Sequence, residues 1–172
     1  MIIKGKLWAI KSKENRLIDN IDTDMIFHNA HLAITDLSQM GQYSFGNLDG
    51  YKNFPELVKP GDIVMVGENF GCGSSRQQAV DCFKSLGINL IIAKSYGAIY
   101  YRNAVNNAFT ILEKPDIEDS EFDSLQELEV DLEEGKLRNL TTNKTFSIKV
   151  LSHIQKQINS AGGLMKLGKV VS

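Results

Sequence analysis

Short apolar segments that alternate with segments of helical periodicity constrain the fold of this chain most strongly. Residues 62–70 and 88–96 are apolar runs typical of buried strands, and residues 110–115 predict a third, shorter strand. Between them, residues 75–87 and 97–109 carry apolar side chains at helical spacing. Because a strand, a helix and another strand in succession usually form a right-handed crossover, we expect these strands to pair in parallel.

The rest of the chain predicts a strand at the start, loops in between and antiparallel strands near the end. Residues 2–10 indicate an opening strand, whereas residues 29–60 predict mainly loop with two short helical turns. Residues 125–151 alternate between apolar and polar side chains like antiparallel strands, and a final helix is expected at about 152–160. The sequence therefore predicts one mixed α/β domain over residues 1–172.

Composition and charge exclude several classes of protein. The formal net charge of −2 provides no electrostatic footprint for nucleic acid or an anionic membrane. No apolar run approaches the ~20 residues that span a bilayer, and the first residues lack a signal-peptide layout, so we expect a cytoplasmic protein. The two cysteines, Cys72 and Cys82, are too few for an iron–sulfur cluster, which usually takes three or four thiolates. We expect no metal bound by this chain alone.

The glycine–serine turn (residues 71–76) is the segment most suggestive of chemistry. Gly71 and Gly73 allow a ligand to approach the backbone closely, Ser74 and Ser75 add hydroxyls, and Arg76 offers a fork that matches a carboxylate. If a helix begins here, its free N–H groups also attract anions. The turn therefore predicts an anion-binding site. The simpler alternative is a serine that only caps the helix.

Three motifs together resemble the swivelling domain of the aconitase superfamily. These are GENFGCGSSRQQAV at residues 67–80, DNIDTDMI at residues 19–26 and IIAKSYGAIYYRNAVNNAF at residues 91–109, and the resemblance spans about residues 4–113. It implies a β/β/α domain of the aconitase C-terminal type, with a mixed sheet or barrel and flanking helices.

The length of the chain refines this resemblance. A full aconitase fuses this domain to much larger cluster-binding domains, whereas here the domain stands in a chain of 172 residues. The chain therefore resembles the small subunit of a two-subunit hydro-lyase of the isopropylmalate dehydratase type. The resemblance implies a hydroxy-diacid substrate and a large partner subunit that carries the iron–sulfur cluster.

The resemblance also implies roles for individual residues. Ser74 would be the catalytic base, and Ser75 and Arg76, next to Gly73, would bind a substrate carboxylate. Asp24 would be a second catalytic residue, a carboxylate near the substrate hydroxyl or the serine. From the residues alone, the Asp-rich segment around Asp24 favours a turn that satisfies its own backbone, and it is the resemblance that favours a catalytic Asp24.

The segment after the aspartates bears on the substrate. Relatives that take a substrate with an extra carboxylate tend to place an arginine in this loop, at or next to the position of Ala33, whereas this chain has His31, Ala33 and Ile34 there and no arginine between Arg16 and Arg76. Since Ala33 and Ile34 suit an alkyl branch, they favour isopropylmalate over homocitrate or citrate. A dimethylmalate or methylmalate dehydratase subunit fits the same segment, and a non-enzymatic anion-binding module remains the alternative from another class. Arg102 and Asn103 are left open between site residues and ordinary contacts of a helix surface.

Overall fold

Seven strands form one mixed sheet, in the order β4-β3-β2-β1-β5-β6-β7, in a computed structural model that describes residues 1–171. The strands are β1 (Ile2–Ala9), β2 (Ile63–Val66), β3 (Leu90–Ala93), β4 (Ile111–Glu113), β5 (Glu127–Asp131), β6 (Lys136–Asn139) and β7 (Lys144–Ser147). The helices are α1 (Thr23–Ile26), α2 (Leu37–Met40), α3 (Phe54–Leu57), α4 (Gln78–Ser85), α5 (Ala98–Asn106), α6 (His153–Ala161) and α7 (Leu164–Val171).

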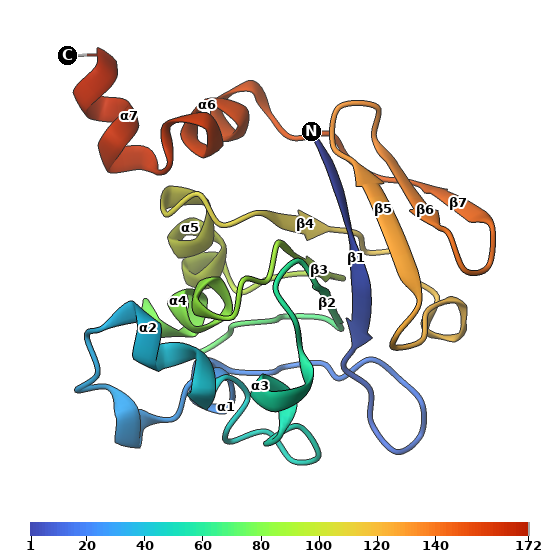
Figure 1. The fold of residues 1–172 in the computed structure, drawn as a ribbon, viewed down its shortest axis with the longest axis horizontal. Coiled ribbons are helices and arrows are strands. Elements are labelled where there is room, and N and C mark those ends of the chain that lie inside the picture. The colour runs from blue at the N-terminus through green and yellow to red at the C-terminus, as the bar shows by residue number, and fades with distance from the viewer. Residues whose placement is uncertain (172) are drawn as a thin grey trace.

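The first strand joins the two halves of the sheet. β1 pairs in parallel with β2 on one side and antiparallel with β5 on the other. The predicted parallel pairing of β2, β3 and β4 is confirmed, and so is the antiparallel arrangement of β5, β6 and β7. In Figure 1 the helices α1 to α5 gather on one side of β1, and the antiparallel strands curl away on the other. The sheet is thus a curled half-barrel with flanking helices, as predicted.

The parallel strands β2 and β3 are apolar throughout because both of their faces are buried. Val64 and Val66 of β2 belong to the hydrophobic core under the helices, whereas Ile63 and Met65 belong to a second core inside the curled sheet. Successive side chains of a strand point to opposite faces, so a strand between two cores needs an apolar residue at every position. This requirement explains the continuous apolar runs in the sequence.

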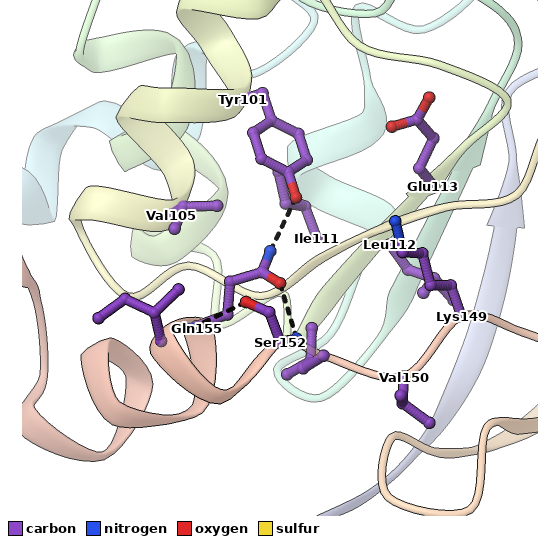
Figure 2. A pocket seen from close by; sticks show the side chains of 11 residues that line it. Tyr101, Val105, Ile111, Leu112, Glu113, Lys149, Val150, Ser152 and Gln155 are labelled. Carbon is purple, nitrogen blue, oxygen red and sulfur yellow. Dashed lines mark hydrogen bonds between the residues drawn. The ribbon is translucent and has the colours of Figure 1, made fainter.

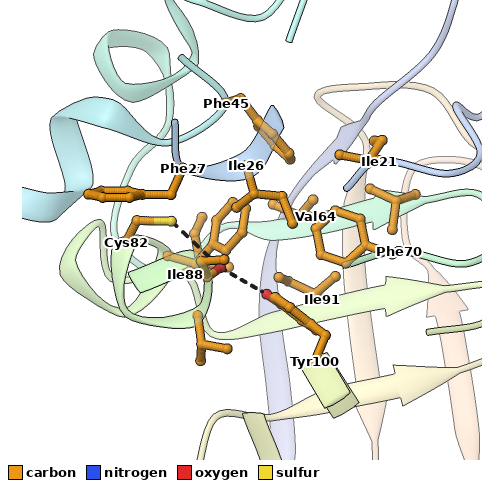
Figure 3. Packing of buried hydrophobic residues seen from close by; sticks show 14 of the residues in the cluster. Ile21, Ile26, Phe27, Phe45, Val64, Phe70, Cys82, Ile88, Ile91 and Tyr100 are labelled. Carbon is orange, nitrogen blue, oxygen red and sulfur yellow. Dashed lines mark hydrogen bonds between the residues drawn. The ribbon is translucent and has the colours of Figure 1, made fainter. Parts of the chain in front are cut away.

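A cluster of aromatic rings forms the centre of the core under the helices. Phe83 of α4 contacts Phe45, Phe70 and Phe54, with ring centroids 5.1, 6.3 and 6.5 Å apart. Phe70 in turn meets the ring of Tyr100 edge to face at 5.2 Å. Figure 3 shows Phe45 and Phe70 converging on this region with Tyr100 from α5. The cluster fixes α4 and α5 against the loops that surround the glycine–serine turn.

The predicted start of the first long helix is wrong. α4 begins at Gln78 and not at residue 75, and its N-cap, Gln77, forms no side-chain cap hydrogen bond. Residues 74–76 instead make hydrogen bonds to other segments of the chain, which hold them outside the helix. Ser74 and Ser75 therefore do not cap α4, and the simpler alternative for the glycine–serine turn is excluded.

The C-terminal part contains one more helix than the sequence predicts. α6 begins after Ser152, which forms a capping box with Gln155, and ends at Gly162 with φ of 77°. These signals explain why this helix was predictable. α7 follows after a break of two glycines and was not predicted. No helix in the described part of the chain is both long and apolar enough to cross a bilayer.

The aromatic cluster yields a prediction about stability. Phe83→Ala should lower the free energy of unfolding by about 3–5 kcal/mol, because it leaves a cavity in a fully buried site. Urea denaturation followed by circular dichroism measures this. Leu57→Ala removes a side chain that is 49% exposed and should change the same quantity by about 0.5 kcal/mol or less. Equal effects of the two substitutions would contradict the assignment of Phe83 to the centre of the core.

Candidate functional site

The glycine–serine turn lies at the carboxyl ends of the parallel strands. It follows β2 and is flanked on both sides by isolated bridges, one between Cys72 and Asp22 and the other between Phe70 and Tyr96. Thr23 strengthens the first contact, because its N–H donates to the Cys72 carbonyl at 2.9 Å. Segments that follow β1, β2 and β3 therefore meet at one edge of the sheet, which is where open α/β sheets usually bind ligands.

The two glycines of the turn are required for different reasons. Gly71 has φ of 75°, and a Cβ atom there would lie 2.2 Å from Cγ of Tyr100. Gly73 has φ of 98°, but a Cβ atom there would meet nothing closer than Thr23 Oγ1 at 3.4 Å. The backbone conformation alone therefore selects glycine at position 73. Gly73 is exposed, which is compatible with the predicted approach of a ligand.

Arg76 connects the turn to the segment around α1. Its Nη1 atom donates to the Phe27 carbonyl at 2.6 Å, to Asp24 Oδ1 at 3.1 Å and to the Thr23 carbonyl at 3.3 Å. Only 10% of the Arg76 side chain is exposed. A guanidinium that is mostly buried must be compensated by acceptors, and these three oxygens provide the compensation.

Asp24 lies in contact with Arg76. The sequence analysis assigns both residues to the same candidate site. Besides Arg76, its carboxylate accepts hydrogen bonds from the Asn29 backbone N–H at 2.9 Å and from Asn47 Nδ2 at 3.1 Å. The hydrogen bond from Arg76 lowers the pKa of the Asp24 carboxyl below its usual value. Asp24 is therefore an ionised, fully engaged carboxylate that orients the guanidinium. Asn47 was not predicted, since nothing in the sequence distinguishes it within a long loop.

Asp22 has the local, backbone-satisfying role that the amino-acid sequence alone suggests for this segment. Asp22 is the N-cap of α1, and its side chain accepts a hydrogen bond from the Met25 N–H at 2.8 Å. This is a local capping interaction, as expected for an aspartate at the start of a helix. Asp22 and Asp24 thus have different roles, since Asp22 caps a helix and Asp24 lies at the candidate site.

The two serines of the turn are exposed but differ in their contacts. Ser74 accepts a hydrogen bond from Thr23 Oγ1 through its backbone carbonyl, at 3.0 Å. Its hydroxyl has no hydrogen-bond partner among the described residues. Ser75 Oγ accepts a hydrogen bond from Asn103 Nδ2 of α5 at 3.3 Å. Asn103 therefore touches the site, whereas the exposed Arg102 makes no hydrogen bond or ion pair within residues 1–171.

The predicted substrate-specifying residues lie beside the start of α4. Gln78 Nε2 donates to the Leu32 carbonyl at 3.2 Å and so holds this loop next to the glycine–serine turn. The ring of His31 stacks on Tyr43 with centroids 3.9 Å apart. Ala33 is exposed, while Ile34 is half-buried against the core under the helices. Of the three predicted residues, Ala33 is thus the most open to a ligand.

The thiols do not fit the ligand set of an iron–sulfur cluster. Burial raises the pKa of Cys72, and it raises the pKa of the fully buried Cys82 to about 12. Both cysteines are free, and no group of three or more His, Cys, Asp or Glu side chains converges anywhere in residues 1–171. The polar groups of the site are instead two hydroxyls, the side-chain amides of Asn47 and Asn103, and the Arg76 guanidinium paired with Asp24. The hydroxyls and the guanidinium suit an anionic organic ligand.

A pocket elsewhere on the surface shares none of the predicted site residues. It has a volume of about 420 Å³ and lies between α5, β4 and residues 149–155. Figure 2 shows Tyr101 and Gln155 joined by a hydrogen bond of 2.7 Å, with Glu113 and Lys149 on the far side of the pocket. This pocket is separate from the glycine–serine turn.

Comparisons with known proteins support the same picture. The family model "Aconitase C-terminal domain" matches residues 9–116. The chain belongs to this family. The 3-isopropylmalate dehydratase small subunit of Thermodesulfovibrio yellowstonii is 39% identical to it over 98% of this chain and 95% of that protein. The methanogen homoaconitase small subunit of Methanocaldococcus jannaschii is 37% identical over 91% of this chain and 89% of that protein.

A solved structure extends the match to the whole fold. The crystal structure of a 3-isopropylmalate dehydratase of Methanocaldococcus jannaschii has a TM-score of 0.86 to this chain at 35% identity. The match covers 99% of this chain and 95% of the other. The predicted resemblance to the aconitase superfamily, and the predicted fold type, are therefore confirmed.

The contact between Asp24 and Arg76 predicts a pH dependence. Because the pKa of Asp24 in the folded chain lies below the usual value for an aspartate, this carboxylate stabilises the fold above that usual pKa, and the contribution is lost as pH falls through the folded pKa. Asp24→Asn should therefore lower the free energy of unfolding at pH 7 and flatten its decline below pH 5. Urea titrations from pH 7 to pH 3 measure this. Asp49→Asn, at an exposed loop position, should follow the unmodified chain, and coincident profiles for both variants would contradict the prediction.

Proposed function

We propose that this protein is the small subunit of a two-subunit hydro-lyase of the 3-isopropylmalate dehydratase type. Such an enzyme removes water from 2-isopropylmalate and adds it back with the hydroxyl on the neighbouring carbon. The observation that carries the proposal is the glycine–serine turn, where an exposed, unpartnered Ser74 hydroxyl lies two residues from a guanidinium held by Asp24. The small-subunit names of the relatives support the same conclusion.

Arg76 would bind one carboxylate of the substrate. All its hydrogen bonds to described residues use Nη1, which leaves Nε and Nη2, the pair that binds a carboxylate in bidentate fashion. Asp24 would not be the base, since its carboxylate is already committed to Arg76, Asn29 and Asn47. Its contribution would be to fix the direction of the guanidinium. Ser75 and the open backbone at Gly73 would complete the carboxylate site.

Ser74 would take the proton from the carbon next to a substrate carboxylate. A serine is a weak base unless its anion is stabilised, and the positive charge of Arg76 is the nearest stabilising group along the chain. The helix dipole contributes less than expected, because α4 begins four residues beyond Ser74. The exposed position of Ser74 suits a base that meets its substrate at the surface of this chain.

The proposal requires a large partner subunit. That subunit would carry an iron–sulfur cluster, which supplies a Lewis acid for the departing hydroxyl when it is bound. The absence of a suitable ligand group in residues 1–171, together with the exposed turn, is consistent with a site completed by another chain. The two free thiols are compatible with a reducing compartment, and we place the complex in the cytoplasm.

The substrate class rests on the loop that contains Ala33. An exposed alanine offers no cation to an additional carboxylate, whereas it can contact an alkyl group. We therefore favour isopropylmalate over homocitrate. The relatives named above include subunits for both substrates, so overall identity does not separate them. Dimethylmalate or methylmalate dehydratase remains the alternative within the same chemistry.

Reconstitution tests the proposed function. Mixed anaerobically with the cluster-loaded large subunit from the same genome, the chain should hydrate isopropylmaleate faster than homoaconitate or dimethylmaleate. Ser74→Ala should lower kcat by about 100-fold or more, since it removes the general base. Ser160→Ala changes an exposed serine of α6 and should leave the rate unchanged. A well-formed complex that turns over none of the three substrates would refute the hydro-lyase and leave an anion-binding module.

The loop argument has a test of its own. Ala33→Arg should move the ratio of kcat/KM between isopropylmaleate and homoaconitate about tenfold or more towards homoaconitate, because a charged hydrogen bond contributes roughly 1.5–3 kcal/mol. Steady-state assays of the reconstituted complex on both substrates give this ratio. Thr35→Arg places the same charge two residues away at another exposed position. An equal shift for both variants would show that position 33 does not face the substrate.

A further inference from the structure

Asn103 of α5 and Asn107, the C-cap of that helix, lie one helical turn apart, and they contact the glycine–serine turn and the residue that follows it. Asn103 Nδ2 donates to Ser75 Oγ at 3.3 Å, and Asn107 Nδ2 donates to Gln77 Oε1 at 3.0 Å. Four residues of a helix advance by about 6 Å, and two residues of extended chain span at most about 7 Å. The i, i+4 spacing of the asparagines therefore matches the i, i+2 spacing of their acceptors.

Further hydrogen bonds fix both partners of the contact between Asn107 and Gln77. Asn107 Nδ2 also donates to the Asn103 carbonyl at 2.8 Å, and Lys84 Nζ donates to the Asn107 carbonyl at 3.0 Å. Gln77 Nε2 donates in turn to Asp81 Oδ1 at 3.0 Å. The Gln77 amide is thus engaged at both its donor and its acceptor. This network fixes the end of the turn to α4 and α5 at once.

The same helix supports the beginning of the turn. The ring of Tyr100 occupies the space that a side chain at position 71 would need. Tyr100 Oη donates to the Ala79 carbonyl of α4 at 3.2 Å. A Cβ atom on Gly97, the N-cap of α5, would lie 3.0 Å from the Cα atom of Cys72. The N-cap of α5 and residues in the first part of the helix therefore contact the turn along its length.

The hydrogen bond from Asn103 determines in which direction the Ser75 hydroxyl can donate its own proton. An amide NH₂ group can only donate, so Ser75 Oγ is the acceptor in this hydrogen bond. The hydroxyl proton is then available for another acceptor. A carboxylate can only accept, and a carboxylate is the group that the proposed function places beside Ser75. The arrangement presents Ser75 as a donor to the substrate.

We propose that Asn103 is a positioning residue that directs the Ser75 hydroxyl proton towards a substrate carboxylate, with Asn107 holding the adjacent Gln77. This inference deepens the proposed function and rests on it. It assigns Asn103 to substrate binding through Ser75, not to the proton transfer at Ser74. The consequence is a change in KM without an equal change in kcat.

Asn103→Asp tests the polarity with little change in shape. The aspartate would accept the hydroxyl proton of Ser75 and withdraw it from the substrate, so KM should rise about tenfold while kcat changes less than threefold. Asn106→Asp is the matched control, because it adds the same charge at an exposed position of α5 whose side chain forms no hydrogen bond or ion pair within residues 1–171. Equal KM values for the two variants would overturn the inference, since the effect would then be charge alone.

A double substitution identifies the route of the effect. In the Ser75→Ala chain the hydroxyl is gone, so Asn103→Asp should raise KM no further than Asn106→Asp does in that background. Effects of Asn103→Asp and Ser75→Ala that simply multiply would show that Asn103 does not act through Ser75, and would overturn the inference. Equal yields and melting temperatures of the variants would exclude misfolding as a cause.

Hydrogen exchange on the isolated chain separates this inference from the proposed function. Asn103→Ala should speed exchange of the Ala79 and Val80 backbone amides, which donate to the carbonyls of Arg76 and Gln77, at least fivefold. Asn106→Ala should leave their exchange unchanged. Unchanged exchange in both variants would overturn the positioning role even if the complex is active. A complex without turnover would refute the proposed function, while faster exchange in the Asn103→Ala chain would still support the contact.

Discussion

The site depends on one buried guanidinium that joins segments some fifty residues apart in the sequence. Arg76 brings its Nη1 atom to acceptors on Thr23, Asp24 and Phe27, and a charge with so little exposure must keep such partners. The segment around α1 is therefore fixed to the glycine–serine turn. Asp24 extends the connection to Asn29, so the loop that would specify the substrate is positioned by the same charge.

The turn gains its shape from contacts on opposite sides. One side meets the segment of Asp22 and Thr23, and the other packs on α5, where Tyr100 leaves room only for glycine at position 71. A loop held in this way keeps its exposed hydroxyls in a defined place without burying them. Preorganisation of this kind lowers the entropic cost of binding a ligand, which suits a surface that meets substrate and partner together.

The sequence predicted those features that depend on local pattern. Apolar runs, helical periodicity and the capping signal at Ser152 gave the parallel strands, the antiparallel tail and α6. The start of α4 was misplaced because long-range contacts of residues 74–76 outweigh their helical pattern. The pairing of Asp24 with Asn47, and of Asn103 with Ser75, joins distant segments, and no periodicity in the sequence reports it. The resemblance to a family located the turn, but not the contacts that orient it.

The central place of β1 has a consequence for how the chain is made. Its parallel partner β2 begins at Ile63, but its antiparallel partner β5 begins only at Glu127. During synthesis one edge of β1 therefore remains without a pairing strand until most of the chain has left the ribosome. Pairings between such distant residues are slow to form. The unpaired backbone N–H and C=O groups of a strand edge can meanwhile associate with other chains. The edge of β1 that later pairs with β5 is therefore where a nascent chain is most exposed to association with other chains.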